Sequence, residues 1–281
     1  MELLQQTDEW LEFRRTKIGS SDAPIIMEVS PWKTPYLLWE EKILGRSNEA
    51  SWWMKRGIEL EEKARETFEN LTGILVTPKV ICHTQYDWMI ASLDGIDIDG
   101  KIVVEIKCPG KEDHFLAMKN QIPEKYYPQL QHQIEVCGID FINYFSFDGE
   151  RGVLIEVPRD DKYIKKMLQK EKLFYECIQQ LVPPEQTDND FDFRSDDIWK
   201  NAANEWILLN EKLKEIEKKE ESLRNFLIEM ANKKNSRGAG IKVSKVIRKG
   251  NVNYSIIPEL KEIDIEKYRK GPIECWKIIK E

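Results

Sequence analysis

The sequence contains few of the residues that build disulfide frameworks and histidine-based metal sites. Five of its 281 residues are cysteine and three are histidine. The cysteines are odd in number, far apart and never paired as CxxC, which argues against a disulfide framework and a zinc ribbon. The histidines are too scattered for a histidine-ligated metal or a histidine general base. We therefore expect a protein of the reducing cytoplasm.

Long apolar runs and an excess of basic residues are also missing. No stretch approaches the roughly 18 apolar residues that a membrane span requires, and the first residues show no basic region followed by an apolar run. The formal net charge is −7, which argues against a protein that coats nucleic acid with a broad basic surface. We expect a soluble protein whose contact with any nucleic acid is local.

Material for a packed interior is abundant. Hydrophobic residues make up 41% of the chain and aromatic residues 10%. A disordered chain would be poor in aromatics, and 281 residues suffice for one well-buried domain with an appendage. The sequence therefore indicates a globular protein with one main core.

The order of hydrophobic patterns predicts an α/β fold. Apolar residues recur at helical spacing through much of the first 73 residues, and then the period changes to two. A helix and a second pair of strands follow, and another amphipathic helix comes after them. The predicted helices span 7–16, a short segment that begins at Ser20 or Ser21, 34–45, 51–73, 123–137 and 160–181. The predicted strands span 74–82, 88–93, 101–107, 141–147 and 151–157.

A boundary follows the last of these helices. Prolines and acidic residues fill 183–196, which we interpret as a linker between a main domain, 1–182, and a C-terminal appendage, 197–281. We predict that the appendage contains a long helix and a β-hairpin that turns at 249–251. The helix carries one seam, with spacings of three and four and only Glu220 breaking its apolar character. Whether the seam packs on its own domain or on a partner chain stays open. The other seam residues are Trp199, Ala202, Trp206, Leu209, Leu213, Ile216, Leu223, Leu227 and Met230.

The segment SLDGIDIDGKIVVEIKCP, residues 92–109, carries the most informative chemistry. Asp94 falls in a turn, and Glu105 and Lys107 are two residues apart on the following strand, so both project from one face. The residues between and before them are apolar and can be buried on the other face. This apolar set is Ile102, Val104 and Ile106.

Two converging carboxylates indicate a magnesium site. Such a pair is costly to hold together without a cation, and hard oxygen ligands are what Mg²⁺ accepts. Lys107 would stabilise the carboxylates of Asp94 and Glu105 without metal. With substrate bound, it would orient or deprotonate the attacking water, or neutralise charge on a phosphate.

The DG and ExK arrangement resembles the PD-(D/E)xK nuclease core, and the chain around it resembles the YqaJ and lambda-exonuclease family of viral recombination nucleases. The resemblance extends over about residues 10–147. Leu93 stands where the name of the superfamily has proline. The resemblance implies a mixed sheet flanked by helices. The similar motifs are WLEFRRTKIGSSDAP, RGIELEEKA, SLDGI, EIKCP and YYPQLQHQIEVCG.

The same resemblance assigns the catalytic and metal-binding residues. Glu61 in RGIELE is similar to the helical acid that completes the metal site, and Asp94 and Glu105 are similar to the two strand ligands. Ile106 would offer its backbone carbonyl. Lys107 resembles the catalytic lysine. The implied metal is Mg²⁺, for which Mn²⁺ would substitute.

The remaining assignments concern the motif helix and the DNA. Gln131, or Gln129, resembles the catalytic glutamine of that helix. Arg14 and Ser21 resemble the residues that hold a DNA 5′-phosphate, and Ser92 resembles a further phosphate contact. A serine hydroxyl, a helix N-terminus and a guanidinium together would form a strong phosphate pocket.

The implied function is 5′-to-3′ exonuclease digestion of linear double-stranded DNA ends, yielding mononucleotides and a 3′ overhang. The implied partners are a single-strand annealing protein of a phage or prophage and further copies of the chain in a ring-shaped homo-oligomer. One alternative is a structure-specific or restriction-like endonuclease of the same superfamily. Another is a non-catalytic DNA-binding recombination scaffold, which would have lost Glu105 or Lys107, whereas both are present.

Overall fold

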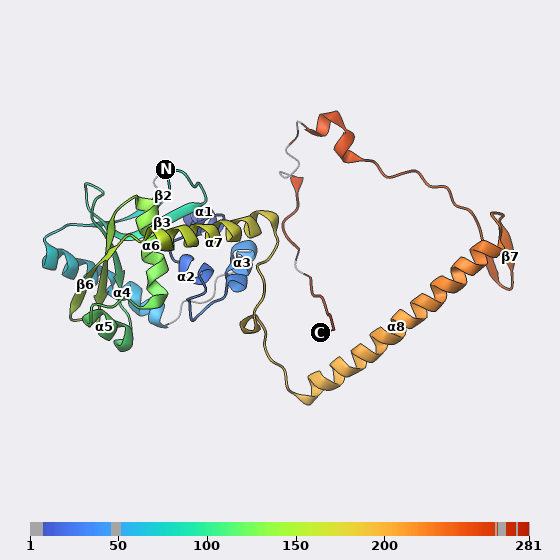
Figure 1. The fold of residues 1–281 in the computed structure, drawn as a ribbon, viewed down its shortest axis with the longest axis horizontal. Coiled ribbons are helices and arrows are strands. Elements are labelled where there is room, and N and C mark those ends of the chain that lie inside the picture. The colour runs from blue at the N-terminus through green and yellow to red at the C-terminus, as the bar shows by residue number, and fades with distance from the viewer. Residues whose placement is uncertain (1–7, 46–51, 262, 264–267, 274, 281) are drawn as a thin grey trace. The chain divides into compact units, whose positions relative to one another are not determined.

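The computed structural model of the chain falls into two compact units, Met1–Phe191 and Asp192–Glu281 (Figure 1). Each unit is described by itself. Among the described residues, no helix is both long enough and apolar enough to cross a bilayer. The described residues are 8–45, 52–261, 263, 268–273 and 275–280.

The first unit alternates helices and strands, as the sequence pattern predicts. Its helices are α1 (Asp8–Arg15), α2 (Ala23–Ile26), α3 (Pro35–Leu44), α4 (Trp52–Thr72), α5 (Lys111–Met118), α6 (Tyr127–Cys137) and α7 (Asp161–Gln180). Its strands are β1 (Ile18–Gly19), β2 (Thr77–Cys82), β3 (Met89–Ile96), β4 (Val103–Lys107), β5 (Phe141–Phe147) and β6 (Gly152–Pro158). Of these, the sequence patterns above did not predict β1 and α5.

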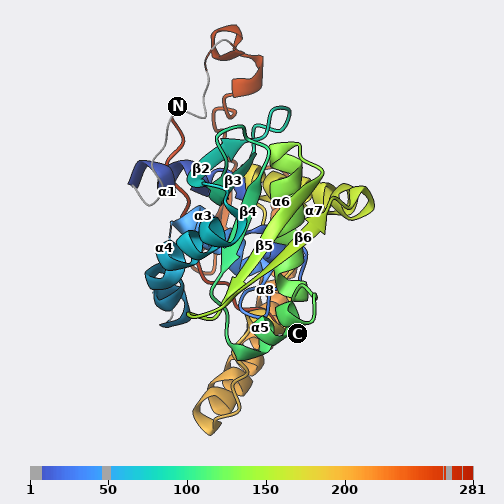
Figure 2. The same cartoon turned by 90° about the vertical axis from the view of Figure 1, so that its left-hand side faces the viewer.

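The six strands form one mixed sheet in the order β1-β3-β4-β5-β6, with β2 paired to β3. The β2–β3, β3–β4 and β5–β6 pairs are antiparallel, and the β1–β3 and β4–β5 pairs are parallel. Helix α6 contacts β3 and β5 and packs against α7, whereas α4 contacts β4 and β6 (Figure 2). The fold is therefore α/β, with a mixed sheet flanked by helices.

Strand alternation sends apolar side chains to both faces of the sheet. The larger core cluster includes Leu130 of α6 and Tyr144 of β5, together with residues of α7. The smaller cluster joins Phe68 of α4 to Val104 and Ile106 of β4. Both faces of β4 are thus covered, which leaves its polar residues to be accommodated inside the unit.

Helix α6 is the central helix of the unit, and its ends follow from its sequence. Pro128 occupies the first turn, where its missing N–H costs no hydrogen bond. Gly138 ends the helix in the left-handed conformation, with φ of 64°. Between them the residues are almost all buried, so α6 presents side chains to β3, β5 and α7 at once.

The second unit contains the long helix α8 (Asp197–Met230) and a short hairpin of β7 (Ser236–Gly238) and β8 (Ile241–Val243). Asp196 caps α8 by accepting a hydrogen bond from the backbone N–H of Trp199. The predicted turn at 249–251 is wrong, because the hairpin turns at Ala239 and Gly240. Both have positive φ, 49° and 82°, as a tight two-residue turn requires.

Candidate active site

Asp94 lies at a fork between two strands. β3 and β4 pair only through Gly95 with Val104 and Ile96 with Val103. The backbone N–H of Ile106, further along β4, donates a 2.8 Å hydrogen bond to Oδ2 of Asp94. The carboxylate of Asp94 therefore accepts a β4 hydrogen bond that a backbone carbonyl of a paired strand would otherwise accept, and it is held against β4.

A bulge and a glycine produce this fork. The β2–β3 register shifts between Thr77 and Lys79, where β3 uses one more residue than β2. At Gly95, an added Cβ would lie 2.6 Å from Val76 and 2.8 Å from Val104. The DG pair of the sequence is thus explained locally, because only glycine allows this close approach beside Asp94.

Glu105 is buried, with 1% of its surface exposed, and three side chains donate to its carboxylate. Nε2 of Gln129 and Nζ of Lys107 each lie 2.5 Å from Oε1. Nε2 of Gln133 lies 2.5 Å from Oε2 and 3.5 Å from the carbonyl oxygen of Ser92. A buried carboxylate with charged and amide donors on both oxygens is held in one orientation.

The charges of the cluster shift each other's protonation. Burial, and then the neighbouring carboxylate of Glu105, hold the pKa of Asp94 well above its usual value, although Lys107 opposes them. Burial alone would lower the pKa of Lys107, but attraction to Glu105 and Asp94 raises it. Without a metal, Lys107 is therefore the cation that keeps the carboxylates together.

Glu61 on α4 completes this set of acids. Its charge contributes to the raised pKa of both Asp94 and Cys108, so it lies within electrostatic reach of the fork. Ile106 turns its side chain into the smaller core cluster, while its main chain runs beside Asp94. The predicted acids Glu61, Asp94 and Glu105 thus belong to one electrostatic cluster.

The donor set fits a hard divalent cation. Burial, and then the neighbouring carboxylate of Glu105, raise the pKa of Asp94, and a bound cation would offset both effects. Oε1 of Gln133, buried beside Glu105, has no hydrogen-bond partner in the described part of the chain. Among the described residues, however, no three acidic, histidine or cysteine side chains already converge closely enough to hold an ion.

Gln131, the first choice for the catalytic glutamine, does not contact the carboxylates in the structure. Its Nε2 donates to the carbonyl oxygen of Pro158 at 2.9 Å, and its Oε1 accepts from the N–H of Asp160 at 2.9 Å. Helical periodicity explains the difference, because residues two apart lie on different faces while residues four apart share one. Gln129, the alternative choice, and Gln133, which was not predicted, lie on the side of the helix that faces Glu105.

Arg14 and Ser21 lie together at the surface. The guanidinium of Arg14 donates to Oγ of Ser21 at 2.5 Å, and it lies over the ring of Trp10. Because β1 pairs with β3 through Gly19 and Ile90, Ser21 follows a strand that neighbours the strand carrying Asp94. Ser92 also lies on β3, two residues before Asp94.

A buried ion pair lies next to Arg14 and Ser21. Nζ of Lys42 on α3 lies 2.8 Å from Oδ2 of Asp22 and donates to the carbonyl oxygen of Lys17 at 2.8 Å. Burial would raise the pKa of Asp22, but attraction to Lys42 and Arg14 lowers it. The N–H of Gly19 also donates to Asp22. The turn that carries Ser21 is thereby fixed.

Sequence reasoning missed a second buried pair beneath the site. Nδ1 of His132 lies 2.8 Å from Oε1 of Glu171, and its Nε2 lies 2.9 Å from the carbonyl oxygen of Ile90. Both ring nitrogens face acceptors, so the doubly protonated ring satisfies both contacts. Burial would lower the pKa of His132, but Glu171 raises it. No local pattern joins residues 39 positions apart.

Comparison with known proteins shows a similarity to one family over part of the chain. Residues 9–140 match the model of the YqaJ-like viral recombinase domain. The uncharacterized protein YqaJ of Bacillus subtilis is 32% identical over 178 residues, covering 60% of this chain and 55% of that protein. Protein D345L of African swine fever virus is 26% identical over 161 residues, 45% of this chain and 44% of that protein. The chain thus spans about half the length of these curated relatives.

Solved structures agree with the sequence comparison. An alkaline exonuclease from Laribacter hongkongensis is 27% identical, with a TM-score of 0.54, over 63% of this chain and 94% of that one. Its complex with dAMP gives 26% identity and a TM-score of 0.55 over the same shares. The fold is of the PD-(D/E)xK nuclease type. Its features are the mixed sheet, the short pairing of β3 with β4, and the cluster of acids beside it. Residues 9–140 are therefore similar to the YqaJ-like viral recombinase domain family.

Proposed function

We propose that this protein is a metal-dependent exonuclease that digests linear double-stranded DNA from its 5′ ends and leaves 3′ overhangs. The proposal rests on two acids that contacts hold in place, Asp94 and Glu105, and on Lys107, which contacts Glu105. The side chain of Lys107 is 24% exposed, so part of it reaches the surface. Likeness to an alkaline exonuclease supports the same activity.

Glu61, Asp94, Glu105 and the carbonyl of Ile106 would hold Mg²⁺ or Mn²⁺. A divalent ion bound there supplies charge stabilisation for a phosphodiester undergoing hydrolysis and lowers the pKa of water. Gln129 and Gln133 keep Glu105 oriented whether or not Lys107 remains attached to it. Lys107, released from its carboxylate, is free to orient the attacking water or to neutralise a phosphate oxygen.

Preference for a 5′ end would come from Arg14 and Ser21. A terminal phosphate would accept from the guanidinium and the hydroxyl, both of which reach solvent. Lys42 neutralises Asp22 beneath them, so the buried carboxylate does not repel the incoming anion. Ser92, on the same strand as Asp94, would contact a further phosphate.

The test compares DNA substrates that differ in one feature. With Mg²⁺, 5′-phosphorylated linear duplex is expected to release mononucleotides and to accumulate 3′ single strands, while closed circular duplex stays intact. Excess chelator is expected to stop the reaction. Cutting of the circle would indicate the rival endonuclease, and DNA binding without hydrolysis would indicate the non-catalytic scaffold. Purified Glu105→Gln protein serves as the inactive control.

The 3′ single strands that such a reaction leaves are substrates for strand annealing. We therefore also propose a phage or prophage single-strand annealing protein as a partner, a ring-shaped homo-oligomer around the DNA, and action in the cytoplasm. These proposals rest on the family of residues 9–140. Co-purification with the annealing protein and the mass of the complex in solution would test the first two.

A further inference from the structure

Helix α8 exposes a continuous apolar seam, the residues spaced by three and four from Trp199 to Met230. Every residue of α8 is described, and none is buried. Leu209, Leu213 and Ile216 expose 57%, 52% and 61% of their surface. The helix has 34 residues, so it is roughly 51 Å long. An apolar stripe of this length normally has a partner.

The period of the seam identifies the kind of partner. The spacing keeps a strict repeat of 3.5 residues over more than four heptads, whereas a straight helix has 3.6 residues per turn. A seam with the 3.5 repeat stays in contact only with another helix that supercoils around it. In heptad terms Trp199, Trp206, Leu213, Glu220 and Leu227 are a positions, and the residues three beyond each are d positions.

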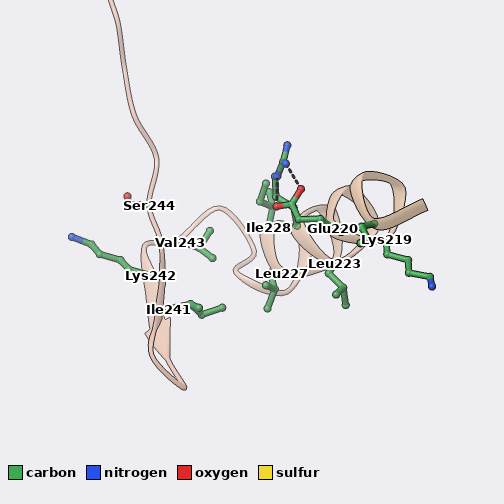
Figure 3. A pocket seen from close by; sticks show the side chains of 11 residues that line it. Lys219, Glu220, Leu223, Leu227, Ile228, Ile241, Lys242, Val243 and Ser244 are labelled. Carbon is green, nitrogen blue, oxygen red and sulfur yellow. Dashed lines mark hydrogen bonds and ion pairs between the residues drawn. The ribbon is translucent and has the colours of Figure 1, made fainter. Parts of the chain in front are cut away.

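The C-terminal half of the seam forms the floor of a groove of about 710 Å³ beside the β7–β8 hairpin. Ile216, Leu223 and Leu227 lie on the helix side, and Ile241 and Val243 point toward them from the hairpin (Figure 3). Lys219 and Arg224, at the g and e positions, border the floor. The groove thus combines the apolar floor and charged borders of one half of a coiled coil.

Glu220 favours a copy of the same helix as the partner of α8. It is the single charged residue of the seam, and it pairs with Arg224 one turn later (Figure 3). In a parallel pair of α8 helices, both Glu220 side chains fall in one layer, surrounded by Lys219 and Arg224 of each chain. Lys212 would also face Glu217 of the other copy. A fully overlapped antiparallel pair would instead press Glu220 against apolar seam residues.

We propose that α8 pairs in parallel, in register, with the α8 of a second copy of this chain. The pairing uses a helix outside residues 9–140, the segment that matches the family domain, so it is separate from contacts between nuclease domains. Glu220 sets the register, because shifting one helix by a heptad would bury its carboxylate among leucines.

The first experiment measures the mass of the full chain in solution by light scattering over a range of concentrations. Wild type is expected at twice the chain mass or more. The double variant Leu209→Asp, Ile216→Asp is expected to have half the wild-type mass. The matched control Asn204→Asp, Asn225→Asp adds the same charge on the opposite face and is expected to keep the wild-type mass. A monomeric wild type, or a mass that the seam variant leaves unchanged, would overturn the pairing.

The second experiment tests orientation and register. Leu209→Cys places like positions opposite each other only in a parallel pair, so mild oxidation is expected to give a disulfide-linked dimer beyond the wild-type background. Glu220→Leu is expected to lower the concentration at which the pair dissociates by tenfold or more. No extra cross-linking of Leu209→Cys, or weaker pairing of Glu220→Leu, would refute the parallel arrangement. Circular dichroism and urea unfolding of each variant check that the chain is folded.

Discussion

Three glutamines of α6 offer a sharp test of the active site, because they share one chemistry and one helix. Gln129 and Gln133 donate to opposite oxygens of Glu105, whereas Gln131 bridges Pro158 and Asp160 at the start of α7. Replacing each in turn with leucine removes the amide and nearly preserves the volume. We expect Gln129→Leu and Gln133→Leu to impair catalysis and Gln131→Leu to impair stability.

The magnitudes follow from the partners. A hydrogen bond to a charged group contributes about 1.5 to 3 kcal/mol, so losing one donor to Glu105 should lower kcat roughly ten- to a hundredfold. Gln131 makes two neutral hydrogen bonds of about 0.5 to 1.5 kcal/mol each, so its loss should lower the free energy of unfolding by about 1 to 3 kcal/mol. Its kcat should stay within a few-fold of wild type.

The assay measures Mg²⁺-dependent release of nucleotides at saturating 5′-phosphorylated duplex, with urea unfolding of the same preparations. Gln131→Leu is the matched control, since it carries the same substitution two residues away. If Gln131→Leu loses as much kcat as Gln129→Leu and Gln133→Leu while all three remain folded, the assignment of Glu105's donors is refuted.

Three further outcomes can be measured on the same protein. Lys107→Ala should lower the hydrolysis rate by orders of magnitude with little change in urea unfolding, and a rate near wild type would remove Lys107 from catalysis. Arg14→Ala should lose about ten- to a hundredfold of the preference for 5′-phosphate over 5′-hydroxyl ends, whereas Arg15→Ala, whose guanidinium binds main-chain carbonyls, should keep it. Glu171 raises the pKa of His132 above 6.5, so stability from this charge is present below that pH and is lost as pH rises through the folded-state pKa. Urea unfolding of His132→Gln should therefore depend less on pH over that window, and an unchanged slope would contradict the charged pair.

The strand that carries Glu105 and Lys107 could be predicted because its signal is local. A period of two places both residues on one face and Val104 and Ile106 on the other, and both faces are occupied as expected. The sequence also singled out the Asp94-Gly95 pair, but it did not show why glycine is needed there. The sequence indicates a turn at Gly95, whereas the structure has a bulge at which Val76 and Val104 leave no room for a side chain.

Other features depend on partners that are distant in sequence. No local sequence pattern near Asp22 predicts its ion pair with Lys42. His132 contacts Glu171 only because α6 and α7 pack together. The hairpin was misplaced for a different reason. Alternation after Ile241 suggested strands around 249–251, but positive φ at Ala239 and Gly240 sets the turn earlier.

The three glutamines of α6 show where a motif stops being informative. The motif YYPQLQHQIEVCG contains three candidate residues, and resemblance alone does not say which face of the helix meets Glu105. Helical spacing would have restricted the choice, since Gln129 and Gln133 share a face that Gln131 does not. Which face of the helix meets Glu105 becomes clear only from the folded sheet. Gln133 contacts Ser92 of β3 and Glu105 of β4.

The cost of burying Glu105 beside Asp94 explains why neutral amides are used there. Two carboxylates in a buried site repel each other, as the raised pKa of Asp94 indicates, and donors must compensate. Had all the donors been cations, they would compete with a divalent ion for the same oxygens. Gln129 and Gln133 orient Glu105 without cancelling its charge, and Lys107 alone supplies a removable positive charge. This arrangement therefore suits the divalent ion proposed above, because the two amides orient Glu105 and leave room for a cation at its oxygens.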